Sequence, residues 1–99
     1  MKQLERIAHM EQILDDAADA VSTLTAALEK YNAIHERLKE LIAYYDSTQW
    51  LQDFEDDNAG KIPKDLKRGV LSEDAVYNLL AENQHLLKVL SSTASSAPL

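Results

Sequence analysis

The fold is decided by residues 7–45, IAHMEQILDDAADAVSTLTAALEKYNAIHERLKELIAYY, in which an apolar side chain returns every three or four positions. Spacings of three and four are typical of a helix that buries one side against other helices. His35 is the single polar member of this repeat. The seam consists of Ile7, Met10, Leu14, Ala17, Val21, Leu24, Leu28, Tyr31, His35, Leu38, Ile42 and Tyr45.

Residues 2–45 contain no glycine and no proline, and good helix formers dominate them. We therefore expect one helix over roughly 2–45, about 65 Å long at 1.5 Å per residue. The weakest place is around Asn32, where a break would be easiest. Because the seven-residue phase runs through it unchanged, we expect no reversal between Tyr31 and His35.

The apolar face is wider than the seam of a two-stranded coiled coil. With Ile7 as position a of the heptad, five of the six g positions are also apolar, from Ile13 to Leu41. A face of this width suits a bundle of three or four helices. The middle of the helix, Ala17 to Ala27, is rich in small residues, which would let a second helix approach closely.

A short second helix is expected after the long one. Asp46 is its expected N-cap, with Gln49 three residues on, and Gly60 is a natural stop. Its apolar residues are expected to form one compact patch that packs into the core at the bend, made of Trp50, Leu51 and Phe54.

The connector that follows is expected to hold a single helical turn, with Pro63 at its first position and Gly69 after its last. Ser72 is the expected cap of a final helix that ends at Leu90, with Leu71 and Val76 as a hydrophobic pair at its start. Asn83 lies on the seam of that helix, where it either sets register or faces water at the edge. The chain is thus expected to hold one helical domain over 1–90 and a flexible tail over 91–99.

These elements predict an all-α fold: a long N-terminal helix, short connector helices and an antiparallel C-terminal helix, forming a coiled-coil-like hairpin or bundle. The final helix would cover less than half of the first, so half of the seam would lack an intrachain partner. We therefore expect a homodimer in which two long helices pair antiparallel through their alanine-rich middles. The dimer seam is expected to contain Ile7, Met10, Leu14, Ala17, Val21 and Leu24.

The composition of the chain limits its possible partners and location. The net charge is −7, from 10 basic and 17 acidic residues, which disfavours nucleic acid and anionic membranes as partners. The chain has no cysteine, which excludes disulfides and thiolate zinc sites and fits a reducing cytoplasm. The first residues carry charges within the helical pattern, so we expect no signal peptide, no membrane span and a cytoplasmic location.

The middle of the chain resembles a family of short bacterial proteins catalogued only as a domain of unknown function. The similar residues are Tyr44-Tyr45, then Trp50-Leu51-x-Asp53-Phe54-Glu55, and then the run from Gly60 to Ala75, GKIPKDLKRGVLSEDA. The N-terminal Glu5-Arg6-Ile7 followed by Met10-Glu11 is also similar. The resemblance implies a bacterial source and an all-helical fold, but no activity, cofactor or catalytic residue.

No motif for catalysis or metal binding is apparent. His9, His35 and His85 lack the spacing of a shared metal site, and the acidic run from Asp53 fails the calcium-loop pattern because position six is not glycine. The serines at 47 and 72 are interpreted as helix caps rather than nucleophiles, and no glycine-rich phosphate loop occurs. We expect no enzyme activity, no catalytic residue, no metal and no cofactor.

The best candidate site is the basic connector. Lys64, Lys67 and Arg68 could bind an acidic protein, a phosphorylated ligand or a nucleic-acid phosphate. The alternative, which we favour, is that these three cations form ion pairs within the chain, with the acidic residues of 53–57 that precede the connector. The candidate partner surface comprises Asp53, Lys64, Asp65, Lys67 and Arg68.

The sequence thus predicts a small helical interaction or assembly protein without catalytic activity. A nucleic-acid-associated regulator that uses Lys64, Lys67 and Arg68 is the alternative. A helical-hairpin effector of the WxG type is disfavoured, because Leu51 and Gln52 follow Trp50 where that motif requires a glycine.

Overall fold

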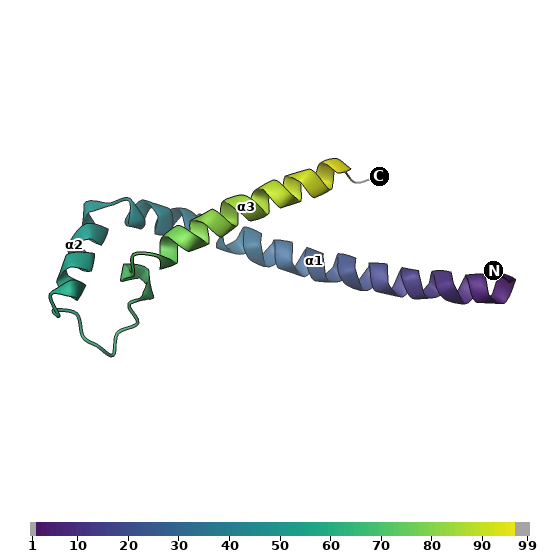
Figure 1. Ribbon diagram of the computed structural model, residues 1–99, viewed down its shortest axis with the longest axis horizontal. Coiled ribbons are helices and arrows are strands. Elements are labelled where there is room, and N and C mark those ends of the chain that lie inside the picture. The colour runs from purple at the N-terminus through teal and green to yellow at the C-terminus, as the bar shows by residue number, and fades with distance from the viewer. Residues whose placement is uncertain (1, 97–99) are drawn as a thin grey trace. The chain divides into compact units, whose positions relative to one another are not determined.

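The computed structural model describes residues 2–96, and these are almost entirely helical. The elements are α1 (Gln3–Tyr45), α2 (Thr48–Asn58), a short 3₁₀ helix η1 (Gly69–Leu71) and α3 (Ala75–Ser96), as Figure 1 shows. No strand occurs within residues 2–96. The predicted all-α fold is therefore confirmed.

The chain forms two compact units, Met1–Leu41 and Ile42–Leu99. The first unit consists of α1 as far as Leu41. The second contains the last turn of α1, the helices α2 and η1, and the whole of α3. Each unit is described by itself below.

Helix α1 runs for 43 residues without interruption, so the predicted absence of a turn near Asn32 is confirmed. Pairs of side chains one turn apart support its exposed faces, for example Gln12 with Asp16 at 3.0 Å and Lys39 with Glu36 at 3.4 Å. None of its residues is buried. Most of the stability that helices gain in proteins comes from packing, which leaves α1 in need of a partner surface.

The N-cap of α2 is Ser47, and the prediction of Asp46 was wrong. The hydroxyl of Ser47 accepts a 3.2 Å hydrogen bond from the Trp50 N–H and donates one of 2.5 Å to the Tyr44 carbonyl. Asp46 still belongs to the last turn of α1, because its N–H donates to the Ile42 carbonyl at 3.1 Å. The cap therefore lies one residue later than predicted.

Gly60 ends α2, as predicted. Its φ of 75° lies in the left-handed region that favours glycine. The N–H of Gly60 donates to the Asp57 carbonyl at 3.0 Å, and the N–H of Lys61 donates to the Asp56 carbonyl at 2.9 Å. These two bonds form a Schellman motif, which satisfies carbonyl groups that the end of a helix leaves free.

The connector differs from its prediction. Pro63 starts a tight turn that Leu66 closes through a 3.2 Å bond to the Pro63 carbonyl, and no helical turn spans Pro63 to Arg68. Helical structure resumes only with η1, which Gly69 begins rather than ends. The reason is burial, because the segment tightens around the buried side chain of Leu71.

The core of the second unit is small. Leu71 and Val76 are 7% and 3% exposed, and no other residue among 2–96 is buried. Trp50 lies beside them, with its ring stacked on Phe54 at 5.1 Å and its indole N–H bonded to the Val70 carbonyl at 2.9 Å. The prediction that Trp50 and Phe54 pack together is confirmed, but Leu51 faces solvent and was wrongly included in the patch.

Ser72 caps the start of the final helix as predicted, since its hydroxyl accepts a 3.1 Å bond from the Ala75 N–H. The end of this helix was predicted too early. Instead of stopping at Leu90, α3 continues to Ser96 through residues expected to be a flexible tail. The hydroxyls of Ser95 and Ser96 donate to the carbonyls one turn back, which satisfies them within the helix. The remaining tail residues, 97–99, lie outside the described residues.

None of the described helices combines the length and the apolar character needed to cross a lipid bilayer.

Candidate functional site

The first candidate surface is the apolar seam of α1. Its large apolar side chains are exposed as far as Leu28, from 39% at Leu28 to 65% at Val21. Toward the C-terminal end of α1 the seam becomes half-buried, at Tyr31, Leu38, Ile42 and Tyr45. The predicted dimer seam lies within this surface, and each of its residues is exposed: Ile7, Met10, Leu14, Ala17, Val21 and Leu24. The seam is therefore a continuous apolar stripe on one helix, available for pairing.

The opposite side of α1 has an uneven charge that sequence reasoning did not use. Residues 7–29 contain five acidic side chains and no lysine or arginine, whereas residues 30–39 contain three basic side chains. In the heptad, every acidic residue of 7–29 avoids positions a, d and g. These residues are Glu11, Asp15, Asp16, Asp19 and Glu29. Two copies of this helix in parallel register would set like charges side by side.

The second candidate surface is the basic connector. Arg68 forms a part-buried ion pair with Asp57, and Lys61 pairs with Asp56 at 3.9 Å. Lys64 and Lys67 are exposed, and neither lies within 4.0 Å of a carboxylate of the described residues. The prediction that the connector's cations are neutralised within the chain is confirmed for Arg68 and was wrong for the two lysines.

Asp53 is held by a residue to which sequence reasoning gave no role. The phenol of Tyr44 donates a 2.5 Å hydrogen bond to Oδ2 of Asp53. Burial, together with the bond to Asp53 and the charge of Asp53, raises the pKa of Tyr44 to about 12. The pair joins the last turn of α1 to α2. A tyrosine one residue before the end of a helix, with an acidic residue in the next helix, was the available signal.

Three residues of the predicted partner surface meet at one recess of about 300 Å³ in the second unit. They are Asp53, Lys67 and Arg68. Lys64 and Asp65 are exposed in the turn before Leu66 and do not line it. The rest of the lining is largely apolar, and consists of Tyr44, Ile62, Leu66, Val70 and Leu71. Because Arg68 is already paired with Asp57, the recess offers one unpaired cation, Lys67.

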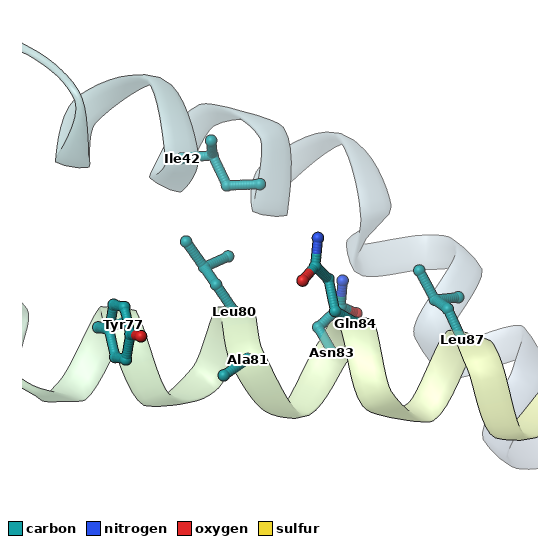
Figure 2. Close-up of a pocket in the computed structure, with 7 residues that line it drawn as sticks. All are labelled: Ile42, Tyr77, Leu80, Ala81, Asn83, Gln84 and Leu87. Atoms are coloured by element: carbon teal, nitrogen blue, oxygen red, sulfur yellow. The ribbon is translucent and has the colours of Figure 1, made fainter.

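A larger groove of about 530 Å³ lies between Ile42 and α3. Figure 2 shows Ile42 projecting from the end of α1 toward α3, while Leu80, Asn83 and Leu87 project from α3 toward that side. Asn83 is half-buried and lines this groove, which does not decide between a role in register and a place at the edge of the seam. Tyr77, Ala81 and Gln84 complete the lining, and no charged side chain takes part.

The described residues contain no group of three His, Asp or Glu side chains that could hold a metal ion. His35 lies with its ring 6.5 Å from that of Tyr31, on the exposed part of α1. The surfaces that stand out among the described residues are an apolar stripe on α1, a groove without charged lining residues, and two lysines outside ion-pair distance of a carboxylate.

Comparison with known proteins identifies a family and adds no activity. No curated protein and no solved structure matches this chain. The family model described as "Domain of unknown function (DUF4298)" matches residues 7–92, which is most of the chain. The protein therefore belongs to the DUF4298 family.

Proposed function

We propose that this protein is a small helical assembly protein that acts by helix-face association and not by catalysis, and that it works as a homodimer. The observation that carries the proposal is the exposed seam of α1, a helix in which no residue is buried. Contiguous apolar surface of this kind marks an interaction site in a protein that functions in water.

The distribution of charge favours an antiparallel pair. In a parallel pair, the acidic residues between Glu11 and Glu29 would lie beside their own copies. In an antiparallel pair, the acidic half of one α1 lies beside the half of the other that carries Lys30, Arg37 and Lys39. Opposite charges along an interface help to set its orientation more than its strength.

The alanines between Ala17 and Ala27 would allow the two helices to approach closely at the centre of such a pair. The wide a, d and g face then contributes apolar area along the rest of the interface. The chain has no cysteine, which fits a reducing compartment, and we propose the cytoplasm.

Light scattering coupled to size-exclusion chromatography at micromolar concentration tests the proposal. The wild type is expected at twice the mass of the 11.1 kDa chain. Leu14→Glu and Val21→Glu each place a charge on the seam and are expected to give monomers with less helix. Thr23→Glu, on the opposite face, is the matched control and is expected to remain a dimer. A wild-type monomer whose helix content is unaffected by Leu14→Glu would contradict the proposal.

The nucleic-acid alternative has less support. Of its three cations, Arg68 is paired with Asp57, which leaves Lys64 and Lys67 on a chain of net charge −7. Phosphate contacts would give binding that weakens steeply with salt. A filter-binding titration against duplex and single-stranded DNA at 50 and 200 mM salt is expected to show no binding. Binding that Lys64→Ala and Lys67→Ala abolish would reverse this preference.

A further inference from the structure

We propose that the groove between Ile42 and α3 is the receptor for the first turns of α1 of a second copy of this chain. The groove would then be half of a composite site that is complete only in the dimer, and each dimer would contain two of them. The inference rests on the proposed homodimer and adds to it a specific role for α3.

The seam leads directly into this groove. Ile42 is a seam residue at heptad position a, and it is also the α1 side of the groove. Figure 2 shows its side chain directed toward Leu80 of α3. A partner helix that follows the seam to its C-terminal end therefore reaches Ile42, which lines the groove.

The heptad register specifies which part of the partner arrives there. In an antiparallel pair, each a residue packs beside a d residue of the other helix. The register centred nearest the middle of Ala17–Ala27 places Val21 opposite Leu24 of the other copy, with the twofold axis between Ser22 and Thr23. The same register places Ile42 opposite Gln3. Its g positions are matched in size: Ala20 lies opposite Ala27, and Ile13 opposite Ile34.

The N-terminal turns of α1 have the apolar side chains that the groove requires. Leu4 and Ile7 lie in the first turns of the helix, and Leu4 is the most exposed of the large apolar residues, at 79%. The groove has apolar walls from Ile42, Leu80 and Leu87, while amides rather than charged groups lie along it. Burial of one against the other removes apolar surface from water on both sides.

Two adjacent leucines of α3 provide a matched test. Leu87 lines the groove and Leu86 does not, although the two are 46% and 45% exposed. Leu87→Ser is expected to raise the dimer dissociation constant at least about tenfold, since it removes a leucine that the interface buries. Leu86→Ser is expected to change it less than about twofold. Sedimentation equilibrium measures both constants, and circular dichroism verifies that each variant stays helical.

Because the chain lacks cysteine, disulfide trapping tests the register without background. In the double variant Gln3→Cys/Ile42→Cys, the two thiols are separated by about 58 Å of helix at 1.5 Å per residue, so any bridge between them must join two chains. The proposal expects a covalent dimer after mild oxidation. The variant Gln3→Cys/Glu40→Cys has its second thiol on the opposite face and is the control that should stay uncrosslinked.

A second pair separates this inference from the homodimer itself. Leu14→Cys/Tyr31→Cys probes the same antiparallel register far from the groove. Crosslinking at 14/31 but not at 3/42, or equal effects of Leu87→Ser and Leu86→Ser, would overturn the groove assignment and leave the dimer standing. A wild-type monomer that crosslinks at neither pair would overturn both.

Discussion

The indole N–H of Trp50 donates a 2.9 Å hydrogen bond to the carbonyl oxygen of Val70, across 20 residues of chain. This single bond closes the long connector onto α2 and brings η1, with the buried Leu71, beside the Trp50 and Phe54 rings. The second unit therefore depends on Trp50, whose side chain is both the largest apolar group of the segment and a hydrogen-bond donor.

Trp50→Phe is expected to destabilise the second unit by about 1–2 kcal/mol, because a ring remains but the Val70 carbonyl loses its donor. Tyr45→Phe is the matched control. Its ring packs edge-on against Trp50 at 5.1 Å, and removal of its hydroxyl should cost less than about 0.5 kcal/mol. Urea denaturation followed by far-UV circular dichroism compares the two. Equal losses would show that the hydrogen bond contributes nothing.

The two glycines of the chain are expected to respond oppositely to alanine. Gly60→Ala should cost about 1 kcal/mol, because its φ of 75° is unfavourable for any residue with a Cβ. Gly69→Ala has open space around the new Cβ and no positive φ, so it should be neutral or stabilising by up to about 1 kcal/mol. Thermal unfolding measures both. A destabilised Gly69→Ala would contradict the structure of η1.

Arg68→Ala is expected to destabilise the second unit by about 1–2 kcal/mol, between the values typical of exposed and of buried ion pairs. The side chains of Arg68 and Asp57 are 34% and 18% exposed, so solvent screens the pair only partly. Lys67→Ala, which removes an unpaired cation of the same segment, should change stability by less than about 0.5 kcal/mol. Trp50 is the sole tryptophan, so its fluorescence in urea follows this unit alone.

Tyr44 should give the protein a distinct response to alkaline pH. Its pKa is raised from 10.0 to about 12 in the folded chain, so the protonated phenol is favoured by folding. Its contribution to stability is therefore fully present below pH 10 and is lost as the pH rises toward 12. The stability difference between wild type and Tyr44→Phe should shrink over that window. Absorbance at 295 nm, wild type minus variant, should show one phenol titrating near 12; titration near 10 would contradict the bond to Asp53.

Local sequence patterns predicted the elements of this fold well. The absence of glycine and proline over residues 2–45 predicted α1, and Gly60 predicted the end of α2, because each depends on backbone preferences that act within a few residues. The errors arose where tertiary contacts decide. Ser47 displaced Asp46 as the cap because the N–H of Asp46 is still bonded to the Ile42 carbonyl of α1. The connector tightened at Gly69–Leu71 because Leu71 is buried there, which no local signal in Pro63–Arg68 indicates.

The sites were harder to predict for the same reason. Charge order along the chain predicted that Arg68 is paired with a preceding acid, but not that Lys64 and Lys67 stay free of one. The Tyr44–Asp53 bond joins two helices across the turn that Ser47 caps. The groove at Ile42 requires α3 to present Leu80 and Leu87 to the end of α1, which periodicity alone does not specify.

The lack of any buried residue in α1 has a consequence for the lifetime of the chain. A helix without a buried side chain opens at little free-energy cost, and open backbone is what proteases cleave. Pairing would close α1 to them, so an unpaired copy would be degraded first. The amount of intact protein in a cell would then rise more steeply than its rate of synthesis, with a threshold set by the dimer dissociation constant.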